Sequence, residues 1–91
     1  MTEIKKELHV INKLGLHARA AAQLVNLTNG FECEVKLGLN GQIIDAKSIM
    51  GIMMLAAAHG SRVELQVRGN DAESAVTAIT DLFANRFGES E

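Results

Sequence analysis

Two segments of this chain, 31–37 and 62–68, alternate strictly between apolar and polar residues. A period of two places the apolar side chains on one face of a β-strand and the polar side chains on the other. A third segment, 4–10, follows the same pattern except at Lys6. Sheets covered on both faces have nearly continuous apolar strands, so this alternation predicts an antiparallel sheet with one face on a core and the other in water.

A tight turn adds a further strand to the predicted sheet. Asn40 and Gly41 form a dipeptide that readily takes positive φ at both central positions of a two-residue turn. The flanking segments 37–39 and 42–46 therefore predict a β-hairpin.

Three segments have the periodicity of amphipathic helices and can cover the apolar face of the sheet. The first spans 17–29 and stops at Gly30, and the second runs from an N-cap at Ser48 to 59–60. The third begins after a cap at Asn70 or Asp71, has its apolar positions from Ala72 to Phe83, and ends before Gly88. Glu73 lies three residues after Asn70, which is the spacing of a capping box. The side chains expected to face the core are Ala18, Ala21, Leu24, Val25 and Thr28 in the first helix, Ile49, Ile52, Met53 and Ala56 in the second, and Ala72, Ala75, Val76, Ile79, Leu82 and Phe83 in the third.

The order of these elements along the chain is βαββαβα. It predicts an α+β open-faced sandwich, in which a four-stranded antiparallel sheet is covered on one face by three helices. No Pro-rich or Ser-rich segment interrupts the chain, so residues 1–91 are expected to form one domain.

Length and charge exclude several classes of function. A chain of 91 residues is too short for large multidomain catalysis, and a formal charge of −2 gives no electrostatic basis for a nucleic-acid partner. The single cysteine, Cys33, cannot form an internal disulfide, and the longest apolar run, 52–58, is too short to span a membrane. These features predict a cytoplasmic protein that inserts no segment into a membrane.

The segment 12–19 delivers a histidine into the first turn of the first predicted helix. Helix N-termini carry unpaired backbone N–H groups and the positive end of the helix dipole, so they stabilise anions. Neutral imidazole is a competent nucleophile near pH 7, and a phosphoryl group on His17 would meet these N–H groups. Arg19 can add a guanidinium to the phosphoryl oxygens. An isolated His-x-Arg is common by chance, so its context decides between this chemistry and a merely polar helix start.

The other candidate ligands carry no predicted chemistry. Cys33 is expected on the apolar face of its strand and His9 on the solvent face of its strand, and His59 lies beside the end of the second predicted helix. None of the three has the spacing of a metal-ligand pair, so no metal site is predicted.

Two sequence motifs go beyond the isolated His-x-Arg. The first begins at Gly15 and reads Gly-Leu-His-Ala-Arg-Ala-Ala-Ala-Gln-Leu-Val, and the second begins at Ala46 and reads Ala-Lys-Ser-Ile-Met-Gly-Ile-Met-Met-Leu. They resemble the phosphorylatable-histidine signature and the regulatory-serine segment, respectively, of HPr, the phosphocarrier family of the bacterial phosphoenolpyruvate-dependent phosphotransferase system. The separation of the two motifs and the βαββαβα order are also those of the family.

The resemblance implies a phosphoryl-transfer component rather than a stand-alone enzyme. His17 would take a phosphoryl group on Nδ1 from phospho-enzyme I and pass it to a IIA domain. Arg19 and the backbone N–H groups from Ala18 onward would hold the phosphoryl oxygens, and no metal or cofactor is implied. Ser48 would be a regulatory site in hosts that have an HPr serine kinase/phosphorylase, beside its structural role as an N-cap. Transcriptional regulators are further candidate partners of a protein that we expect to be a monomer.

A carrier must present an adaptable and weakly charged surface to several partners. Methionine side chains suit such a surface, although Met53 is expected in the core. The residues predicted to dock partners are Ala20, Gln23, Leu27, Lys47, Ile49, Met50 and Met54.

Position 20 departs from the family pattern. The family usually has proline directly after His-x-Arg, where it rigidifies the first helical turn, but this chain has Ala20 and no proline at all. We therefore expect a functional but less preorganised site. Only Lys13, Arg19 and Lys47 are expected to supply positive charge near His17, which predicts weak electrostatic steering of acidic partners.

The sequence alone leaves three functions open. The leading one is a phosphocarrier of the sugar system. A carrier of the nitrogen-related regulatory branch would use the same histidine chemistry with different partners. A noncatalytic α+β ligand-binding or regulatory module would share the layers without the relay, because a fold does not fix a function.

Overall fold

The computed structural model describes residues 2–91, and its elements follow the predicted βαββαβα order. They are β1 (Thr2–His9), α1 (Ala18–Thr28), β2 (Glu34–Leu39), β3 (Gln42–Asp45), α2 (Ile49–Leu55), β4 (Arg62–Gly69) and α3 (Ala72–Ala84), followed by a 3₁₀ turn, η1 (Arg86–Gly88).

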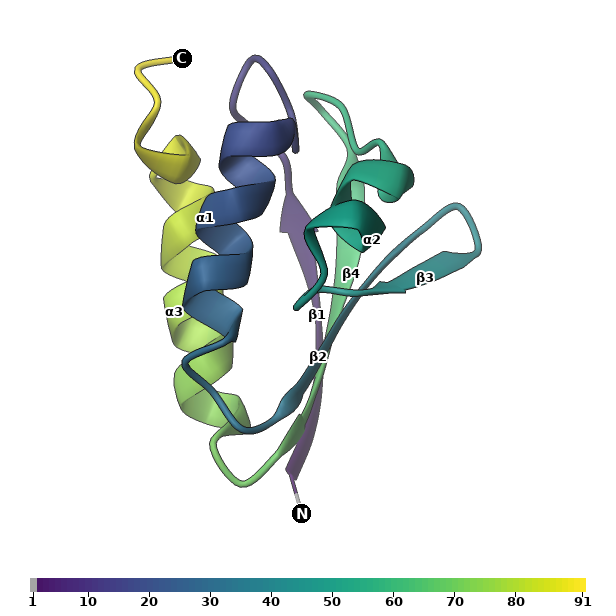
Figure 1. The fold of residues 1–91 in the computed structure, drawn as a ribbon, viewed down its shortest axis with the longest axis vertical. Helices are drawn as coiled ribbons and strands as arrows, with labels where there is room; N and C mark the ends of the chain where they lie inside the picture. The colour runs from purple at the N-terminus through teal and green to yellow at the C-terminus, as the bar shows by residue number, and fades with distance from the viewer. Residues whose placement is uncertain (1) are drawn as a thin grey trace.

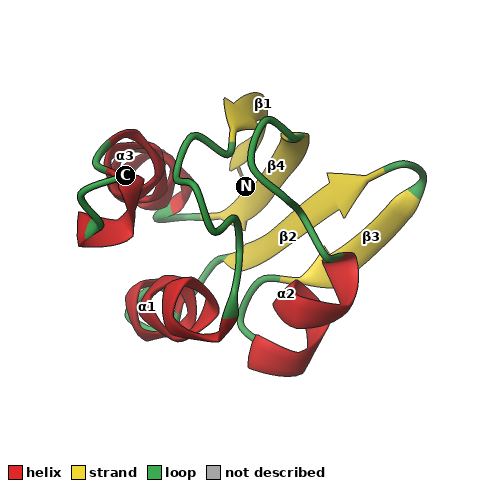
Figure 2. Cartoon of the chain, turned by 90° about the horizontal axis from the view of Figure 1, so that it is seen from above, coloured by secondary structure: helices red, strands yellow, loops and turns green. Residues whose placement is uncertain are grey.

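Within residues 2–91 the four strands form one antiparallel sheet in the order β1-β4-β2-β3. The helices α1, α2 and α3 all cover the same face of this sheet (Figure 1), as the view from above also shows (Figure 2). Alternate strand positions turn their apolar side chains toward the helices, and burial of this face is the main stabilising contribution to the fold. The predicted open-faced sandwich is confirmed. The strand residues that are at most 1% exposed are Val35, Leu37, Val63, Leu65 and Val67.

The connection between β2 and β3 is the predicted tight turn. Asn40 and Gly41 have φ angles of 53° and 84°, so both central positions are left-handed. Leu39 and Gln42 pair directly on either side of the turn. This geometry matches the right-handed twist of the two strands.

Lys6, the one mismatch in the first alternating segment, has a structural reason. Its Nζ atom donates to the Thr80 hydroxyl of α3 at 3.3 Å. Because β1 is an edge strand, a lysine there can lay its stem along apolar surface and keep its ammonium group at the rim.

The second helix is shorter than predicted. It ends at Leu55, because Ala56 adopts the left-handed conformation (φ 54°, ψ 39°) and returns its N–H to the Met53 carbonyl. Only Ile52 and Leu55 of α2 are buried. The prediction that Met53 and Ile49 face the core is wrong, since they are 43% and 42% exposed.

The buried face of α1 is also rotated from the prediction. Ala18 is exposed, whereas Ala20 is fully buried. Ala20, Leu24 and Thr28 are spaced four residues apart, so they form one row on the helix surface, and this row packs into the core.

The start of α3 is organised differently from a capping box. Asp71 is the N-cap residue but makes no capping bond with its side chain. Its carboxylate instead accepts the backbone N–H groups of Glu32 at 2.8 Å and Cys33 at 3.0 Å. The bond from Glu32 holds the pKa of Asp71 below its ordinary value. The predicted box of Asn70 and Glu73 is therefore wrong, and Asp71 instead ties α3 to the segment entering β2.

Candidate functional site

His17 lies at the N-terminal end of α1, as predicted. It is the N-cap residue with an extended backbone (φ −75°, ψ −179°), and its side chain makes no capping bond. The chain reaches this point through Gly15, whose φ is 67°, and the N–H of Leu16 donates to the Ala57 carbonyl at 2.9 Å. The loop that follows α2 thus fixes where α1 begins.

The first turn of α1 presents backbone donors. The first helical bond joins the N–H of Ala21 to the His17 carbonyl at 2.8 Å. The N–H groups of Ala18, Arg19 and Ala20 precede this bond and have no acceptor among residues 2–91. Together with the positive end of the helix dipole, they make this end of α1 suited to an anion.

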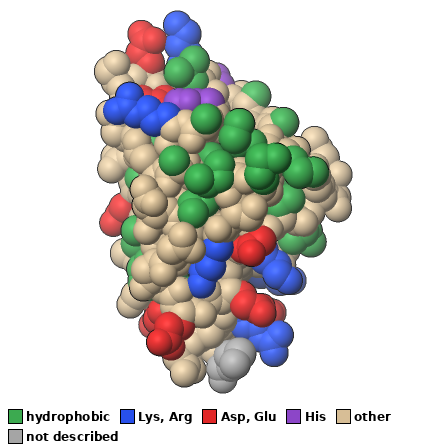
Figure 3. All heavy atoms as spheres, viewed as in Figure 1, with side chains coloured by type: hydrophobic (Ala, Val, Ile, Leu, Met, Phe, Trp, Pro, Cys, Tyr) green, Lys and Arg blue, Asp and Glu red, His purple; other side chains and the backbone are tan. Residues whose placement is uncertain are grey.

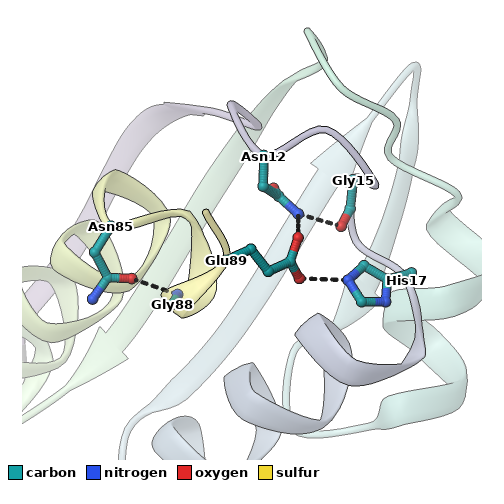
Figure 4. A network of polar contacts seen from close by, with 6 residues as sticks. All are labelled: Asn12, Gly15, His17, Asn85, Gly88 and Glu89. Carbon is teal, nitrogen blue, oxygen red and sulfur yellow. Dashed lines mark hydrogen bonds and ion pairs between the residues drawn. The ribbon is translucent and has the colours of Figure 1, made fainter. Parts of the chain in front are cut away.

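A carboxylate from a distant part of the chain contacts the His17 ring. Nε2 of His17 lies 2.5 Å from Oε2 of Glu89, and Oε1 of Glu89 accepts from Nδ2 of Asn12 at 3.2 Å (Figure 4). The same Asn12 nitrogen donates to the Gly15 carbonyl at 2.8 Å. The hydrogen bond with His17 lowers the pKa of Glu89, with a smaller contribution from Asn12, so Glu89 is a carboxylate at neutral pH.

The contact with Glu89 distinguishes the two ring nitrogens of His17. A carboxylate only accepts hydrogen bonds, so Nε2 must carry the proton. In the neutral ring the lone pair is then on Nδ1. The His17 side chain is 29% exposed and the Glu89 side chain 13%, so the ring is reachable while its partner is largely covered. This arrangement suits Nδ1 for nucleophilic chemistry.

Arg19 lies on the rim of a surface depression beside this contact. Its side chain is exposed, and its positive charge contributes to the lowered pKa of Glu89. Figure 3 shows Lys and Arg atoms next to histidine atoms in this region. The depression is lined by Lys13, Leu14, Arg19, Gly88, Glu89, Ser90 and Glu91.

Helix α2 runs antiparallel to α1 and ends close to His17. At one end the Thr28 hydroxyl donates to the Ala46 carbonyl at 2.9 Å, just before α2 begins. At the other end the bond between Leu16 and Ala57 joins the loop after α2 to the residue before His17. The residues late in α2 are therefore the ones nearest to the histidine.

Exposed apolar side chains gather on α2. Met50 is 69% exposed, Met54 65%, and Ile49 and Met53 somewhat more than two-fifths. We call these four residues the α2 surface. Figure 3 shows hydrophobic atoms concentrated on this side of the molecule, close to the histidine atoms. Large exposed apolar patches of this kind commonly mark protein interaction sites.

The prediction that Ala20 offers its side chain to partners is wrong. Its side chain is 0% exposed because it belongs to the buried row of α1. Gln23 and Leu27 are partly buried, and Leu27 packs against the core. Their role in docking stays a prediction.

The expectation that Lys47 lies near His17 is also wrong. Its Nζ atom donates to the Phe31 carbonyl at 2.7 Å, beyond the C-terminal end of α1. The eleven residues of α1 span about 16 Å at 1.5 Å per residue. Lys47 therefore supplies no positive charge at the histidine, where Arg19 and Lys13 remain.

Known proteins are similar to this chain over nearly its whole length. A family model described as the PTS HPr component phosphorylation site matches residues 4–85. The chain belongs to the HPr family. The phosphocarrier protein HPr of Cupriavidus necator is 52% identical over 88 residues, which cover 97% of this chain and 99% of the relative. HPr of Pseudomonas aeruginosa is 45% identical over 86 residues and covers 93% and 96%.

Solved HPr structures have the same fold. The crystal structure of HPr-C-His from Thermoanaerobacter tengcongensis is 40% identical, has a TM-score of 0.89 and covers 100% of both chains. HPr from Bacillus anthracis is 38% identical, has a TM-score of 0.84 and covers 89% of this chain and 96% of that one.

Ser48, in the second HPr motif, caps α2 as predicted. Its Oγ atom accepts the N–H of Gly51 at 3.0 Å, and its side chain is partly exposed. It precedes the exposed Ile49 and Met50. Its regulatory phosphorylation stays a prediction.

Two residues of the site, Asn12 and Glu89, are not predicted from the sequence. Asn12 is fully buried despite its polar side chain, because it donates to both Gly15 and Glu89. Glu89 follows His17 by 72 residues and lies outside the part matched to the HPr model. No spacing or periodicity connects Glu89 with His17, so only the folded chain brings them together.

The remaining candidates make no hydrogen bond or ion pair with His17 among residues 2–91. Burial, and to a smaller extent a hydrogen bond with Asp71, raises the pKa of the Cys33 thiol to about 11. The thiol is therefore a poor nucleophile at neutral pH. His9 is exposed and lies 3.4 Å from Glu7. His59 is exposed in the loop after α2. Among residues 2–91 there is neither a cluster of three or more metal-ligating side chains nor a helix long and apolar enough to cross a membrane.

Proposed function

We propose that this HPr-family chain accepts a phosphoryl group from phospho-enzyme I on Nδ1 of His17 and transfers it to IIA domains of the phosphotransferase system. The observation that carries the proposal is the environment of the His17 ring. Its Nε2 atom faces Glu89, which leaves the lone pair on Nδ1. The ring lies at the end of α1 where the first backbone N–H groups have no helical bond.

The proposed transfer needs no metal. The Nδ1 lone pair forms a bond to phosphorus while the bond between phosphorus and the donor breaks, and its electron pair stays with the donor. The ring then carries a positive charge, next to the Glu89 carboxylate. The phosphoryl oxygens can accept from the N–H groups of Ala18 and Arg19 and from the Arg19 guanidinium. Transfer to a IIA domain returns the electron pair to Nδ1.

Docking is proposed to occur on the α2 surface. The enzyme and the acceptor must reach the same ring in turn, and these exposed side chains lie on the helix whose end is joined to the residue before His17. Flexible methionines can adapt to more than one partner.

The test of the proposal is phosphorylation by enzyme I. Incubation with phosphoenolpyruvate and enzyme I should give an adduct that is acid-labile and base-stable, as a phosphohistidine is. His17→Ala should give none, and His9→Ala, at an exposed histidine that lies beside Glu7, should behave as wild type. The absence of an adduct on the wild-type chain would overturn the proposed function.

The same assay separates a carrier of the sugar system from a carrier of the nitrogen-related regulatory branch. Enzyme I of the sugar system and enzyme I of the nitrogen-related system would be compared at equal concentration. We propose the sugar branch, so the sugar-type enzyme should phosphorylate the chain faster. A faster reaction with the nitrogen-type enzyme would assign the other branch.

We also propose that a kinase phosphorylates Ser48 and thereby weakens docking. The hydroxyl is partly exposed and adjoins the α2 surface, where a phosphate would add negative charge to an apolar contact. Ser48→Asp keeps a good N-cap and adds charge, while Ser48→Asn keeps a good N-cap without charge. Slower transfer in the Asp variant alone would support this role, and equal rates would contradict it, as would the absence of phosphoserine after incubation with ATP and host extract.

A further inference from the structure

The segment 86–91 folds back from α3 onto the site. Arg86 and Phe87 both have positive φ, 59° and 55°, which is uncommon for residues other than glycine and persists only where surrounding contacts hold it. The contact that holds it here is the burial of Phe87, whose side chain is 1% exposed and whose ring centroid lies 5.0 Å from that of Phe83. The turn redirects the chain toward the start of α1.

Further bonds fix the segment on both sides of Glu89. Before it, the N–H of Gly88 donates to Oδ1 of Asn85 at 3.2 Å (Figure 4). After it, the N–H of Lys13 donates to the Glu91 carbonyl at 3.0 Å, and the Lys13 ammonium lies 3.5 Å from the Glu91 carboxylate. The position of Glu89 is therefore set by the surrounding fold.

Glu89 also receives a contact that orients its carboxylate. Asn12, which is fully buried, donates to one oxygen while the other faces His17, so the two oxygens are assigned different partners. Asn12 is in turn held by the Gly15 carbonyl, in the connection that leads to the histidine. The other charged groups around the carboxylate are Arg19, Lys13 and Glu91.

We propose that Glu89 is a positioning residue for phosphoryl transfer at His17. It holds the proton on Nε2, fixes the ring plane, and compensates the positive charge that the ring acquires when Nδ1 bonds to phosphorus. Many metal-binding and catalytic histidines have a carboxylate that orients the ring and sets its tautomer in this way. This inference rests on the proposed function, and it adds a residue that lies outside the part matched to the HPr family model.

The proposal distinguishes orientation from charge. Glu89→Ala removes both the acceptor and the negative charge. Glu89→Gln removes the charge and keeps one acceptor oxygen, which can serve the ring if the bond from Asn12 is given up. If both contributions matter, the rate of phosphorylation falls in the order wild type, Gln, Ala.

The matched control is Glu91→Gln. Glu91 belongs to the same segment and its carboxylate is paired with Lys13 rather than with His17. The substitution keeps the backbone bond from the Lys13 N–H to the Glu91 carbonyl, so the contact between Glu89 and the ring should stay in place.

The experiment measures each variant with enzyme I and phosphoenolpyruvate, and records the ring N–H signal of His17 by NMR in the unphosphorylated protein. We expect Glu89→Ala to lower kcat roughly tenfold, as loss of a carboxylate behind a functional histidine commonly does, with KM unchanged because docking lies on α2. We also expect the Nε2–H proton, protected from exchange in wild type and in Glu91→Gln, to disappear in Glu89→Ala. Unchanged unfolding midpoints exclude a merely structural effect.

Two outcomes would overturn the inference. An unchanged kcat in Glu89→Ala would show that the contact has no role in transfer, and a faster one would show that the segment restrains the histidine instead. Both outcomes leave the proposed function intact, because the wild-type chain is then still phosphorylated. A wild-type chain that is not phosphorylated overturns the proposed function itself, and with it the role of Glu89 in transfer.

Discussion

Gly15 lies so close to Ala57 that a Cβ atom on it would stand 2.6 Å from the Ala57 carbonyl oxygen. The same oxygen accepts the N–H of Leu16. A side chain at position 15 would therefore push apart the contact that sets the start of α1, and it would do so at a φ of 67°, where residues with a Cβ are strained.

Gly15→Ala should consequently damage both stability and transfer. We expect a loss of about 1–3 kcal/mol in the free energy of unfolding, since backbone strain adds to the steric conflict. The rate of phosphorylation should fall as His17 shifts. Gly41→Ala is the control, because Gly41 also has a positive φ but open space around it. Equal losses in the two variants, measured by urea unfolding, would contradict the role given to the contact with Ala57.

Met54→Lys should weaken docking without altering the histidine. Met54 is 65% exposed near the end of α2, and a charge there would interrupt an apolar contact. We expect KM for enzyme I to rise about tenfold, which corresponds to about 1.4 kcal/mol of binding. Ile43→Lys is the matched control, since Ile43 is 56% exposed but lies on β3, where it pairs with Gly38 of β2. A similar rise in both variants would argue against a docking role for α2.

The sequence predicted the sheet well because alternation reports directly which strand face is buried. It also located His17 at the start of α1, since a histidine after a glycine-containing connection is a local pattern. The buried face of α2 could not be predicted, because two helical turns with apolar residues all round do not reveal which side is covered. For this reason the prediction that Met53 faces the core is wrong. Glu89 was missed because its contact depends on the fold-back of the segment 86–91.

Ala20→Pro tests the departure from the family pattern. The N–H of Ala20 makes no helical bond, so a proline removes no existing bond of the native state and restricts the unfolded chain. We expect a gain of about 0.4–1 kcal/mol in the free energy of unfolding and a rate of transfer at least equal to wild type. A loss of stability would show that the proline ring collides with the core around the fully buried Ala20.

Asp71 should make stability depend on acid pH. Its pKa is lowered in the folded state, chiefly by the N–H of Glu32, so the carboxylate stabilises the fold above its unfolded pKa, near 3.8. This stabilisation should be lost as the pH falls below that value. The difference in free energy of unfolding between wild type and Asp71→Asn should therefore be large at neutral pH and shrink toward pH 2. A difference that does not vary with pH would rule out this linkage.

The most direct test of the account is to locate the phosphoryl group on the chain. The ¹⁵N-labelled protein would be phosphorylated with enzyme I and phosphoenolpyruvate, and the histidine ring nitrogens assigned by long-range ¹H–¹⁵N NMR. The account predicts that Nδ1 of His17 carries the phosphoryl group while Nε2 keeps its proton beside Glu89. A phosphoryl group on Nε2 of His17, or on His9 or His59, would contradict it.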